Sequence, residues 1–252
     1  MRYEQVEGKH AVLEALRGRR QAYELLLAEG LRPGKVLDEI LEMARRRKVP
    51  VTTLPRREIE RLAVSETHQG VILRVEPYRY ATFKQVYSRL ENADQPLVVL
   101  LDGVTDPRNL GSIARTCEAV GVDALLLPRS RSAPVTPAVF HSSAGAVENL
   151  AVATVPNLVS VMKELKKLGI WVVGADARAE DSCFRADLTG PLALVMGSEG
   201  EGLHRLTRET CDSLVRVPMF GKVSSLNVSV AAAVILYEIL RQRKKVGSSL
   251  ET

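Results

Sequence analysis

The sequence is poor in aromatic residues and in cysteine, and both scarcities narrow the class of protein. Only 4% of the 252 residues are Phe, Trp or Tyr, which disfavours a module that stacks splayed RNA bases on aromatic rings. The three cysteines, Cys117, Cys183 and Cys211, form no CxxC or Cys/His pair. Neither a zinc site nor a disulfide framework is therefore expected, and a reducing compartment fits best.

Long apolar segments are missing as well. The longest unbroken apolar run, residues 230–237, is far shorter than the ~20 residues that a membrane helix needs. The first residues, MRYEQ, lack the apolar stretch of a secretory signal. We therefore expect a cytoplasmic protein without a membrane span.

An excess of positive over negative charge is present in the first third of the chain and lacking in the rest. Residues 1–90 hold 18 Lys/Arg against 12 Asp/Glu, whereas residues 91–252 hold 17 against 18. All of the net charge of +5 thus comes from the front. This asymmetry indicates two units, of which the first faces an anionic partner.

Hydrophobic patterning supports the same division. Short strands and helices alternate over residues 1–76, which predicts a small α/β domain, and a polar linker is expected over 77–94. The remainder, 95–252, contains short continuous apolar runs, each followed by Asp, Gly or Pro. Such runs are typical of a parallel sheet covered on both faces, in which ligands bind beyond the carboxyl ends of the strands. The predicted runs are Leu97–Leu101, Ala124–Leu127, Ile170–Ala175, Leu192–Met196 and Leu214–Val217.

Three loops of this second unit carry candidate functional residues. Residues 109–115 read NLGSIAR, in which Asn109 suits a helix N-cap and Arg115 follows six residues later. Residues 197–203 read GSEGEGL and lack the Lys-Ser/Thr end of a Walker loop. Residues 225–229 read SLNVS and place two polar groups at the start of an apolar helix. Each loop also has a structural explanation, namely a capped helix with a surface arginine, a flexible turn and a second cap.

Together these loops resemble the SpoU-type (TrmH-like) RNA 2′-O-ribose methyltransferases of the SPOUT superfamily. All three segments occur in family order and at family spacing. Residues 7–12 (EGKHAV) and 65–71 (SETHQGV) resemble the substrate-binding domain fused to the tRNA and rRNA members. With residues 140–146 (FHSSAGA), the chain most resembles the branch that methylates a guanosine in the peptidyl-transferase region of bacterial 23S rRNA.

The resemblance implies a fold that periodicity alone does not predict. The catalytic part would be an α/β parallel-sheet SPOUT domain with a deep trefoil knot, an exception to ordinary topology. The front would be an L30e-like α/β domain that binds RNA. The family acts as a homodimer with active sites near the interface, and the apolar helix expected over 226–243 suits such burial.

The resemblance also implies S-adenosylmethionine as cofactor and no metal. Cofactor-binding residues would be Gly174, Met196, Gly197, Val217, Met219 and Leu226. Arg115 would be the central catalytic residue, either as a base or as a phosphate-binding group that orients the ribose hydroxyl; sequence alone leaves both open, although the very high pKa of arginine conflicts with a base. Asn109, Glu199, Ser225 and Asn227 would orient the ribose and Arg115.

Cations and histidines of the front are candidate RNA contacts. Several such charges acting together release counter-ions from RNA. Cations at helix C-termini also complement the helix dipole, which accounts for Arg45 and Arg46 but not for Arg56, expected at a helix N-terminus. The candidates are His10, Arg45, Arg46, Arg56 and His68 in the front, and Arg129 and Arg131 beside the catalytic loops. The histidines have an equally plain explanation as locally hydrogen-bonded residues.

Three other functions compete with methylation of a guanosine in 23S rRNA. The same motifs serve tRNA or other rRNA sites, and a paralogue could bind RNA without catalysis. A nicotinamide-dependent oxidoreductase is disfavoured, because no GxGxxG follows residue 101 and no ribose-binding acid stands at the expected distance.

Overall fold

The computed structural model describes residues 3–18, 20–64 and 67–246. The chain forms two compact units, each of which is described by itself. The N-terminal unit consists of residues 1–79 together with 134–149, and the C-terminal unit of residues 80–133 and 150–252. The grouping places residues 134–149 with the front, whereas the expected boundaries 1–76, 77–94 and 95–252 kept that segment with the catalytic part. Ser65 and Glu66 of the SETHQGV segment lie outside the described residues.

The N-terminal unit is a four-stranded mixed sheet in the order β1-β4-β2-β3, with helices packed on it. Strands β2 and β3 are parallel, and the other two pairs are antiparallel. Its core is aliphatic, and Leu25, Ile40, Ile59 and Ile72 are fully buried. The elements are β1 (Glu4–Glu7), α1 (Lys9–Arg17), β2 (Ala22–Ala28), α2 (Lys35–Arg46), β3 (Val51–Leu54), α3 (Arg56–Leu62), β4 (Val71–Val75), α6 (Pro137–Ser142) and the 3-10 turn η1 (Ala146–Glu148).

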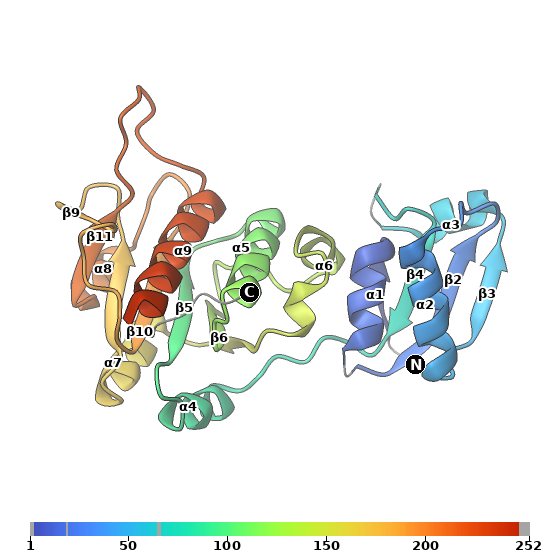
Figure 1. Cartoon of the computed structure of the whole chain (residues 1–252), viewed down its shortest axis with the longest axis horizontal. Helices are drawn as coiled ribbons and strands as arrows, with labels where there is room; N and C mark the ends of the chain where they lie inside the picture. Colours follow the sequence, from blue (N-terminus) through green and yellow to red (C-terminus); the bar gives the residue numbers. More distant parts are fainter. Residues whose placement is uncertain (1–2, 19, 65–66, 247–252) are drawn as a thin grey trace. The chain divides into compact units, whose positions relative to one another are not determined.

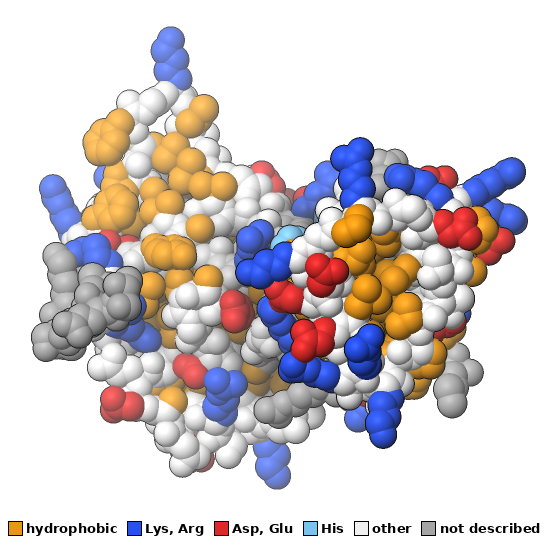
Figure 2. Space-filling model, turned by 45° about the vertical axis from the view of Figure 1, so that its right-hand side comes forward, with side chains coloured by type: hydrophobic (Ala, Val, Ile, Leu, Met, Phe, Trp, Pro, Cys, Tyr) orange, Lys and Arg blue, Asp and Glu red, His pale blue; other side chains and the backbone are white. Residues whose placement is uncertain are grey.

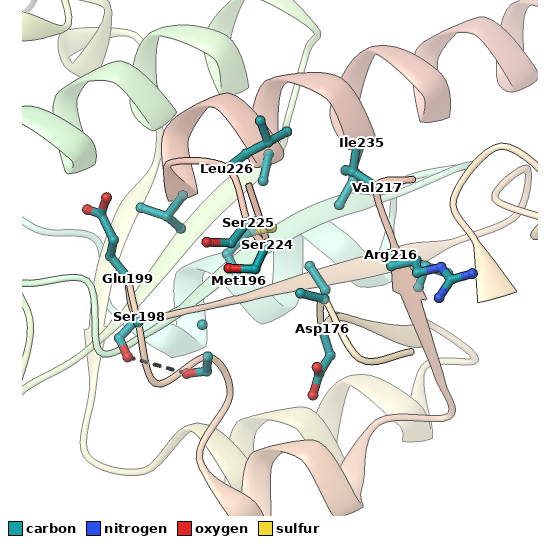
Figure 3. Close-up of a pocket in the computed structure, with 18 of the residues that line it drawn as sticks. Asp176, Met196, Ser198, Glu199, Arg216, Val217, Ser224, Ser225, Leu226 and Ile235 are labelled. Atoms are coloured by element: carbon teal, nitrogen blue, oxygen red, sulfur yellow. Dashed lines mark hydrogen bonds between the residues drawn. The ribbon is translucent and has the colours of Figure 1, made fainter. Parts of the chain in front are cut away.

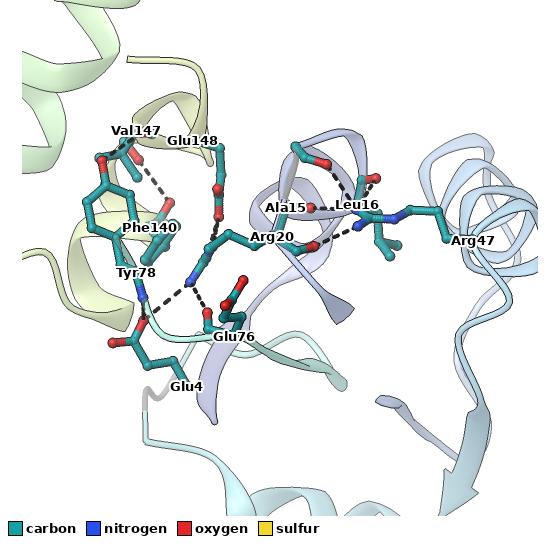
Figure 4. Close-up of polar contacts among 12 residues, drawn as sticks. Glu4, Ala15, Leu16, Arg20, Arg47, Glu76, Tyr78, Phe140, Val147 and Glu148 are labelled. Atoms are coloured by element: carbon teal, nitrogen blue, oxygen red, sulfur yellow. Dashed lines mark hydrogen bonds and ion pairs between the residues drawn. The ribbon is translucent and has the colours of Figure 1, made fainter. Parts of the chain in front are cut away.

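A buried arginine joins residues 134–149 to this unit (Figure 4). Arg20, 8% exposed, donates two hydrogen bonds to Glu148, one of them from Nε at 2.8 Å, and a third to the carbonyl of Glu76 at 3.0 Å. Its guanidinium also lies 4.5 Å from the ring centroid of Phe140. Burial raises the pKa of the Glu148 carboxyl, although Arg20 acts to lower it.

Replacement of Arg20 tests how strongly this cluster holds the unit together. We expect Arg20→Met to lower the unfolding free energy of the N-terminal unit by about 3–5 kcal/mol at neutral pH, because the Glu148 carboxylate stays buried without its partner. The loss should shrink as the pH falls, since protonation of Glu148 removes the unpaired charge. Hydrogen exchange of the β2 and β4 amides in urea measures this unit alone.

The matched control is the exposed Arg46, which pairs with Glu42 one turn away. We expect Arg46→Met to change the same free energy by no more than about 0.5 kcal/mol. Equal losses in the two variants would show that burial of Arg20 is not the cause.

The C-terminal unit is built on a seven-stranded sheet in which every pair is parallel. The strand order is β7-β6-β5-β10-β8-β11-β9. The parallel sheet predicted from continuous apolar runs is confirmed. The elements are α4 (Phe83–Glu91), β5 (Leu97–Asp102), α5 (Pro107–Ala119), β6 (Ala124–Pro128), β7 (Val152–Val155), α7 (Leu158–Lys167), β8 (Trp171–Ala175), β9 (Asp181–Ser182), β10 (Leu192–Gly197), α8 (Arg205–Thr210), β11 (Ser213–Arg216) and α9 (Val228–Val246).

Helices cover both faces of this sheet (Figure 1). One face packs against α4 and α7 through a cluster that includes Val98, Leu100, Met162 and Leu165. On the other face α5 lies beside α9, which also contacts the central strand β10. Because helices cover both faces of the sheet, a ligand site is expected in the loops that follow the carboxyl ends of its strands.

Several elements differ from the sequence-based expectation. Strands β1, β7 and β9 and helices α6 and α8 are additional to those predicted, and α9 begins at Val228 rather than at 226. No helix among the described residues is long and apolar enough to cross a membrane. The trefoil knot stays a prediction.

Candidate active site

A cavity opens at the carboxyl ends of β8, β10 and β11, where the sequence analysis placed the site (Figure 3). Its empty space, including the part open to solvent, is about 760 Å³. The start of α9 closes one side through Val228, Ala231 and Ile235. Of the six predicted cofactor-binding residues, five line the cavity: Met196, Gly197, Val217, Met219 and Leu226.

The sixth, Gly174, faces elsewhere. A Cβ atom at Gly174 would lie 2.7–2.8 Å from the side chains of Leu203, Cys211 and Leu214. The glycine therefore permits close packing beneath the sheet edge, and it is not among the residues that line the cavity.

The glycine-rich segment forms a closed turn at the cavity wall. Ser198 and Gly202 exchange two backbone hydrogen bonds of 3.0 and 3.1 Å, and Gly200 and Gly202 have left-handed φ values of 94° and 74°. A Cβ at Gly197 would lie only 2.2 Å from the carbonyl carbon of Gly202. Backbone thus occupies the space of a side chain, and only glycine fits at position 197.

The three motifs meet in a hydrogen-bonded cluster. The Asn109 amide donates to Glu199 Oε2 at 3.0 Å and accepts from Asn227 at 3.0 Å. Asn227 also donates to both Glu199 oxygens at 3.3 and 3.4 Å. Side chains 90 and 118 residues apart in the sequence are joined directly. This Asn109–Glu199–Asn227 cluster combines α5, the glycine turn and the start of α9.

The role of Asn109 in its helix differs from the expectation. The N-cap of α5 is Asp106, whose side chain accepts from the backbone N–H of Arg108 at 2.8 Å, and Pro107 is the first helical residue. Asn109 lies in the first turn of α5 and is 8% exposed. Because Asp106 caps the helix, the Asn109 side-chain amide makes its hydrogen bond to Glu199 instead. The prediction of Asn109 as the cap was wrong.

The other predicted catalytic residues lie in different surroundings. Ser225 lines the cavity (Figure 3). Arg115 is exposed on α5, does not line the cavity, and makes no hydrogen bond or ion pair with the part of the chain that the structure describes. Six residues correspond to a rotation of roughly 240° beyond a full turn, so Arg115 and Asn109 point from different faces of α5.

Asp176 is a lining residue that was not among the predicted site residues, although it begins a loop that follows a predicted strand. It follows β8 and is 6% exposed. Burial acts to raise its pKa, but hydrogen bonds from Arg178 and the charges of Arg178 and Arg208 outweigh burial and hold the pKa below its usual value. Asp176 therefore stays ionised at neutral pH. Its place directly after an apolar strand was the available signal.

The predicted RNA contacts of the N-terminal unit are not gathered at one place. His10 is exposed at the start of α1, where it lines a shallow cavity with Lys35 of α2. Arg45 and Arg46 are exposed at the opposite end of α2. Figure 2 shows the Lys and Arg side chains of this unit interspersed with acidic ones.

Two of these candidates have local partners. His68 Nδ1 accepts a hydrogen bond from the backbone N–H of Gly70 at 3.0 Å, which stabilises the turn before β4. Arg56 pairs with Glu60 one turn along α3 at 3.3 Å. His68 thus has the local hydrogen bond that was left open as its alternative explanation, and Arg56 has an ion-pair partner that was not expected.

The described residues include no reactive thiol and no cluster that could bind a metal ion. Burial raises the pKa of Cys211 to about 12 and raises that of Cys117 and Cys183, so these thiols stay protonated at neutral pH. No group of three or more His, Cys, Asp or Glu side chains within residues 3–18, 20–64 and 67–246 could hold a metal ion.

Comparison with known proteins identifies the family. Residues 96–237 match the SpoU rRNA methylase family, and residues 5–81 match the RNA 2′-O ribose methyltransferase substrate-binding domain. The chain belongs to the SpoU rRNA methylase family. Relatives include the Bacillus subtilis protein YacO, assigned by name to the TrmH family of tRNA/rRNA methyltransferases, with 42% identity over 97% of this chain and 98% of that protein.

A second relative and a solved structure extend this finding. The 23S rRNA (guanosine-2′-O-)-methyltransferase RlmB of Pseudomonas putida is 42% identical over 96% of this chain and 97% of its own length. The SpoU methyltransferase AviRb of Streptomyces viridochromogenes, solved in complex with the cofactor AdoMet, has a TM-score of 0.79 and 28% identity and covers 98% of this chain and 92% of its own. The chain is therefore an RNA ribose 2′-O-methyltransferase of a class that uses S-adenosylmethionine.

Proposed function

We propose that this chain methylates the ribose 2′-oxygen of a guanosine in 23S rRNA, in the peptidyl-transferase region, and does so in the cytoplasm. The observation that carries the proposal is the Asn109–Glu199–Asn227 cluster, which reaches the wall of the glycine-rich cavity through Glu199. The RlmB relative supports the choice of guanosine and of 23S rRNA. Methylation of a tRNA or of another rRNA site is the alternative, since relatives named for both RNAs match equally well.

The cavity fits S-adenosylmethionine on its own chemistry. Met196, Val217, Leu226 and Ile235 supply an apolar lining, and the glycine turn exposes backbone groups to a ligand without side chains between. The charged groups of the lining are Asp176, Glu199 and Arg216. Asp176 is paired with Arg178 and Arg208, so Glu199 is the carboxylate that favours a cationic sulfonium over a phosphate. When bound, the cofactor supplies an electrophilic methyl group.

The residues of the chain then orient the nucleophile. The Asn109–Glu199–Asn227 cluster and Ser225 would hold the ribose at the cavity mouth, and Arg115 would bind an adjacent phosphate so that the 2′-oxygen faces the methyl carbon in line. A guanidinium group is a very weak proton acceptor, which favours this orienting role over that of a base. The hydroxyl proton would leave late, to that phosphate or to water.

Mapping the product tests this proposal. Unmodified 23S rRNA, purified from a strain that lacks the gene, is incubated with the chain and tritiated S-adenosylmethionine, and the labelled nucleotide is located by nuclease digestion and mass spectrometry. We expect one 2′-O-methylguanosine in the peptidyl-transferase region. A methylated base, or label only in tRNA, would refute the substrate assignment.

We further infer a homodimer, formed through the start of α9 and the loop before it. Phe220 and Val223 of that loop are 98% and 64% exposed, and Val230 and Tyr237 of α9 are 48% and 54% exposed. Figure 2 shows apolar side chains gathered on the projecting part of the C-terminal unit. Exposed apolar side chains gathered in this way are typical of a protein interface.

A charge placed in this patch should break the dimer. We expect Tyr237→Glu to raise the dimer dissociation constant at least about tenfold, because a large interface aromatic is replaced by a desolvated carboxylate. Sedimentation velocity measures the constant. Trp171→Glu is the control, because Trp171 is also half exposed but stands at the amino end of β8. An unchanged constant in Tyr237→Glu would exclude this face.

A further inference from the structure

The C-terminal unit has a second cavity that the methyl-transfer site does not use. It opens where β5 and β6 end and is lined by Asp102, Arg131, Asn157 and His204, among others. Its empty space, including the part open to solvent, is about 890 Å³. The walls combine two cations, Arg131 and Arg205, with a single carboxylate, that of Asp102.

Asp102, His204 and Arg131 form a line of contacts along this cavity. Asp102 is 6% exposed and accepts a hydrogen bond from the backbone N–H of His204 at 2.9 Å. Its other oxygen lies 2.9 Å from Nδ1 of the His204 ring. On the far side of the ring, Nε2 lies 3.1 Å from Nη1 of Arg131.

The chemistry of the three groups fixes the direction of this line. A guanidinium nitrogen can only donate, so Nε2 of His204 must be the acceptor and the ring proton is on Nδ1, beside the Asp102 carboxylate. His204 is hydrogen-bonded to Asp102 through its backbone N–H, whereas its ring Nδ1 lies 2.9 Å from the carboxylate without hydrogen-bond geometry. The ring in turn contacts the Arg131 guanidinium. The Asp102 carboxylate faces His204 and not Arg131. The Arg131 guanidinium therefore keeps its positive charge for a ligand.

The backbone also holds Arg131 in place. Arg131 has a φ of 58°, a left-handed conformation that is uncommon for a residue with a side chain. The Ser132 hydroxyl donates to the carbonyl of Pro128, and the Ala133 N–H donates to the carbonyl of Val104 at 2.9 Å. The loop is therefore attached to the segment that leads into α5, and its strain is typical of a functional position.

The second cavity lies beside the glycine turn of the first. A Cβ at Gly103 would lie 3.2 Å from the Ser198 side chain and 3.3 Å from the His204 ring. Ser198 lines the cofactor cavity and His204 lines the second cavity. Residues 198–204 thus separate two cavities at one edge of the sheet, so a polymer that enters one can continue into the other.

We propose that the second cavity binds a phosphodiester of the RNA chain that flanks the target nucleotide. Arg131 is the phosphate ligand, and His204 is a positioning residue that acts through Arg131 and is held by Asp102. The proposal rests on the proposed function, since it takes the RNA bound at the first cavity as its ligand. A planar guanidinium held in advance suits bidentate contact with phosphate oxygens.

Removal of the Arg131 charge gives the primary test. The probe is the unmodified 23S rRNA transcript, bound by filter assay without cofactor over a range of salt concentrations. We expect Arg131→Gln to weaken binding about tenfold and to lower the slope of log affinity against log salt by about 1. Calorimetry should show unchanged affinity for S-adenosylmethionine, and methylation should show a raised KM for RNA with kcat retained.

The matched control is Arg89→Gln. Arg89 lies near Asp123 at the opposite end of β6, so the same charge is removed from the same unit. We expect it to leave the affinity for the transcript and the salt slope unchanged. Unchanged binding in Arg131→Gln, with wild-type methylation intact, would overturn the phosphate site and leave the proposed function standing. If the wild-type chain binds the transcript through Arg131 but methylates no ribose, the proposed function falls and the phosphate site stands.

A double-mutant cycle tests the positioning role of His204. His204→Phe keeps a ring but removes the acceptor, whereas His204→Gln retains an acceptor near the position of Nε2. We expect the Phe variant to raise the KM for RNA as Arg131→Gln does, and the Gln variant to restore most of the affinity. The Arg131→Gln/His204→Phe double variant should be no weaker than Arg131→Gln alone. Additive losses, or no rescue by Gln, would overturn the positioning role.

Discussion

Arg115→Ala should abolish methyl transfer while S-adenosylmethionine still binds with near-normal affinity. The side chain is exposed on α5 and does not line the cofactor cavity, so its loss leaves the cavity intact. The guanidinium is expected to fix the RNA phosphate beside the reacting hydroxyl, and a misplacement of the reactants by about 1 Å already costs on the order of 10²-fold in rate. Single-turnover incorporation of tritiated methyl groups into 23S rRNA measures the rate, and calorimetry measures the cofactor affinity.

The conservative variant separates the two roles that the sequence leaves open. Lysine can still bind phosphate as a point charge, so Arg115→Lys should retain part of the activity if Arg115 orients the RNA. If Arg115 is instead a base, the lysine variant should gain rate with rising pH as its ammonium deprotonates. Retained wild-type turnover in Arg115→Ala would exclude Arg115 from catalysis altogether.

The sheet of the C-terminal unit was predictable because burial on both faces leaves continuous apolar runs. Val98–Leu101 and Leu192–Val195 are fully or almost fully buried, as such runs predict. Strand β7 was not predicted, since Val152–Val155 is short and interrupted by Thr154. Strand β1 was missed for a similar reason, because Glu4–Glu7 contains three polar residues and one valine. Strand β1 forms because it pairs with β4, whose nearest register partner, Ile72, lies 65 residues beyond Glu7 in the sequence.

Local chemistry also explains which parts of the site were predictable. The motif residues Asn109, Glu199 and Asn227 were identified, and the structure brings them together. Their roles in the helix were harder to predict, because Asp106 and Asn109 are both good caps and only the position of Pro107 decides between them. The contact of Asp102 with His204 joins residues 102 positions apart and leaves no pattern in the sequence.

The segment 134–149 shows a similar limit. Its sequence lies between two strands of the C-terminal unit, yet Arg20 and Glu148 hold it in the N-terminal unit. Neither charge is distinctive among the 65 charged residues of the chain. Only their mutual burial marks them, and burial of a polar pair is a tertiary property.

The second large effect is expected at Gly197, where a single methyl group should disable the cofactor cavity. A Cβ would lie 2.2, 2.4 and 2.5 Å from backbone atoms of Gly202 and Leu203, which no rotamer change can relieve. The Ser198–Gly202 hydrogen bonds must then break, and the turn must move. We expect Gly197→Ala to weaken S-adenosylmethionine binding about tenfold to a hundredfold, as overpacking of this kind costs about 1–3 kcal/mol.

The same movement should reach catalysis, because Glu199 stands on the turn and holds both Asn109 and Asn227. Methyl transfer at saturating cofactor should therefore fall as well, which separates this variant from one that lowers cofactor affinity alone. Gly190→Ala is the control: it precedes β10 as Gly197 ends it, and a Cβ there meets no atom within 4 Å. Normal cofactor affinity in Gly197→Ala would show that the turn accommodates a methyl group without loss of binding. The proposal that this turn shapes the cofactor cavity would then be wrong.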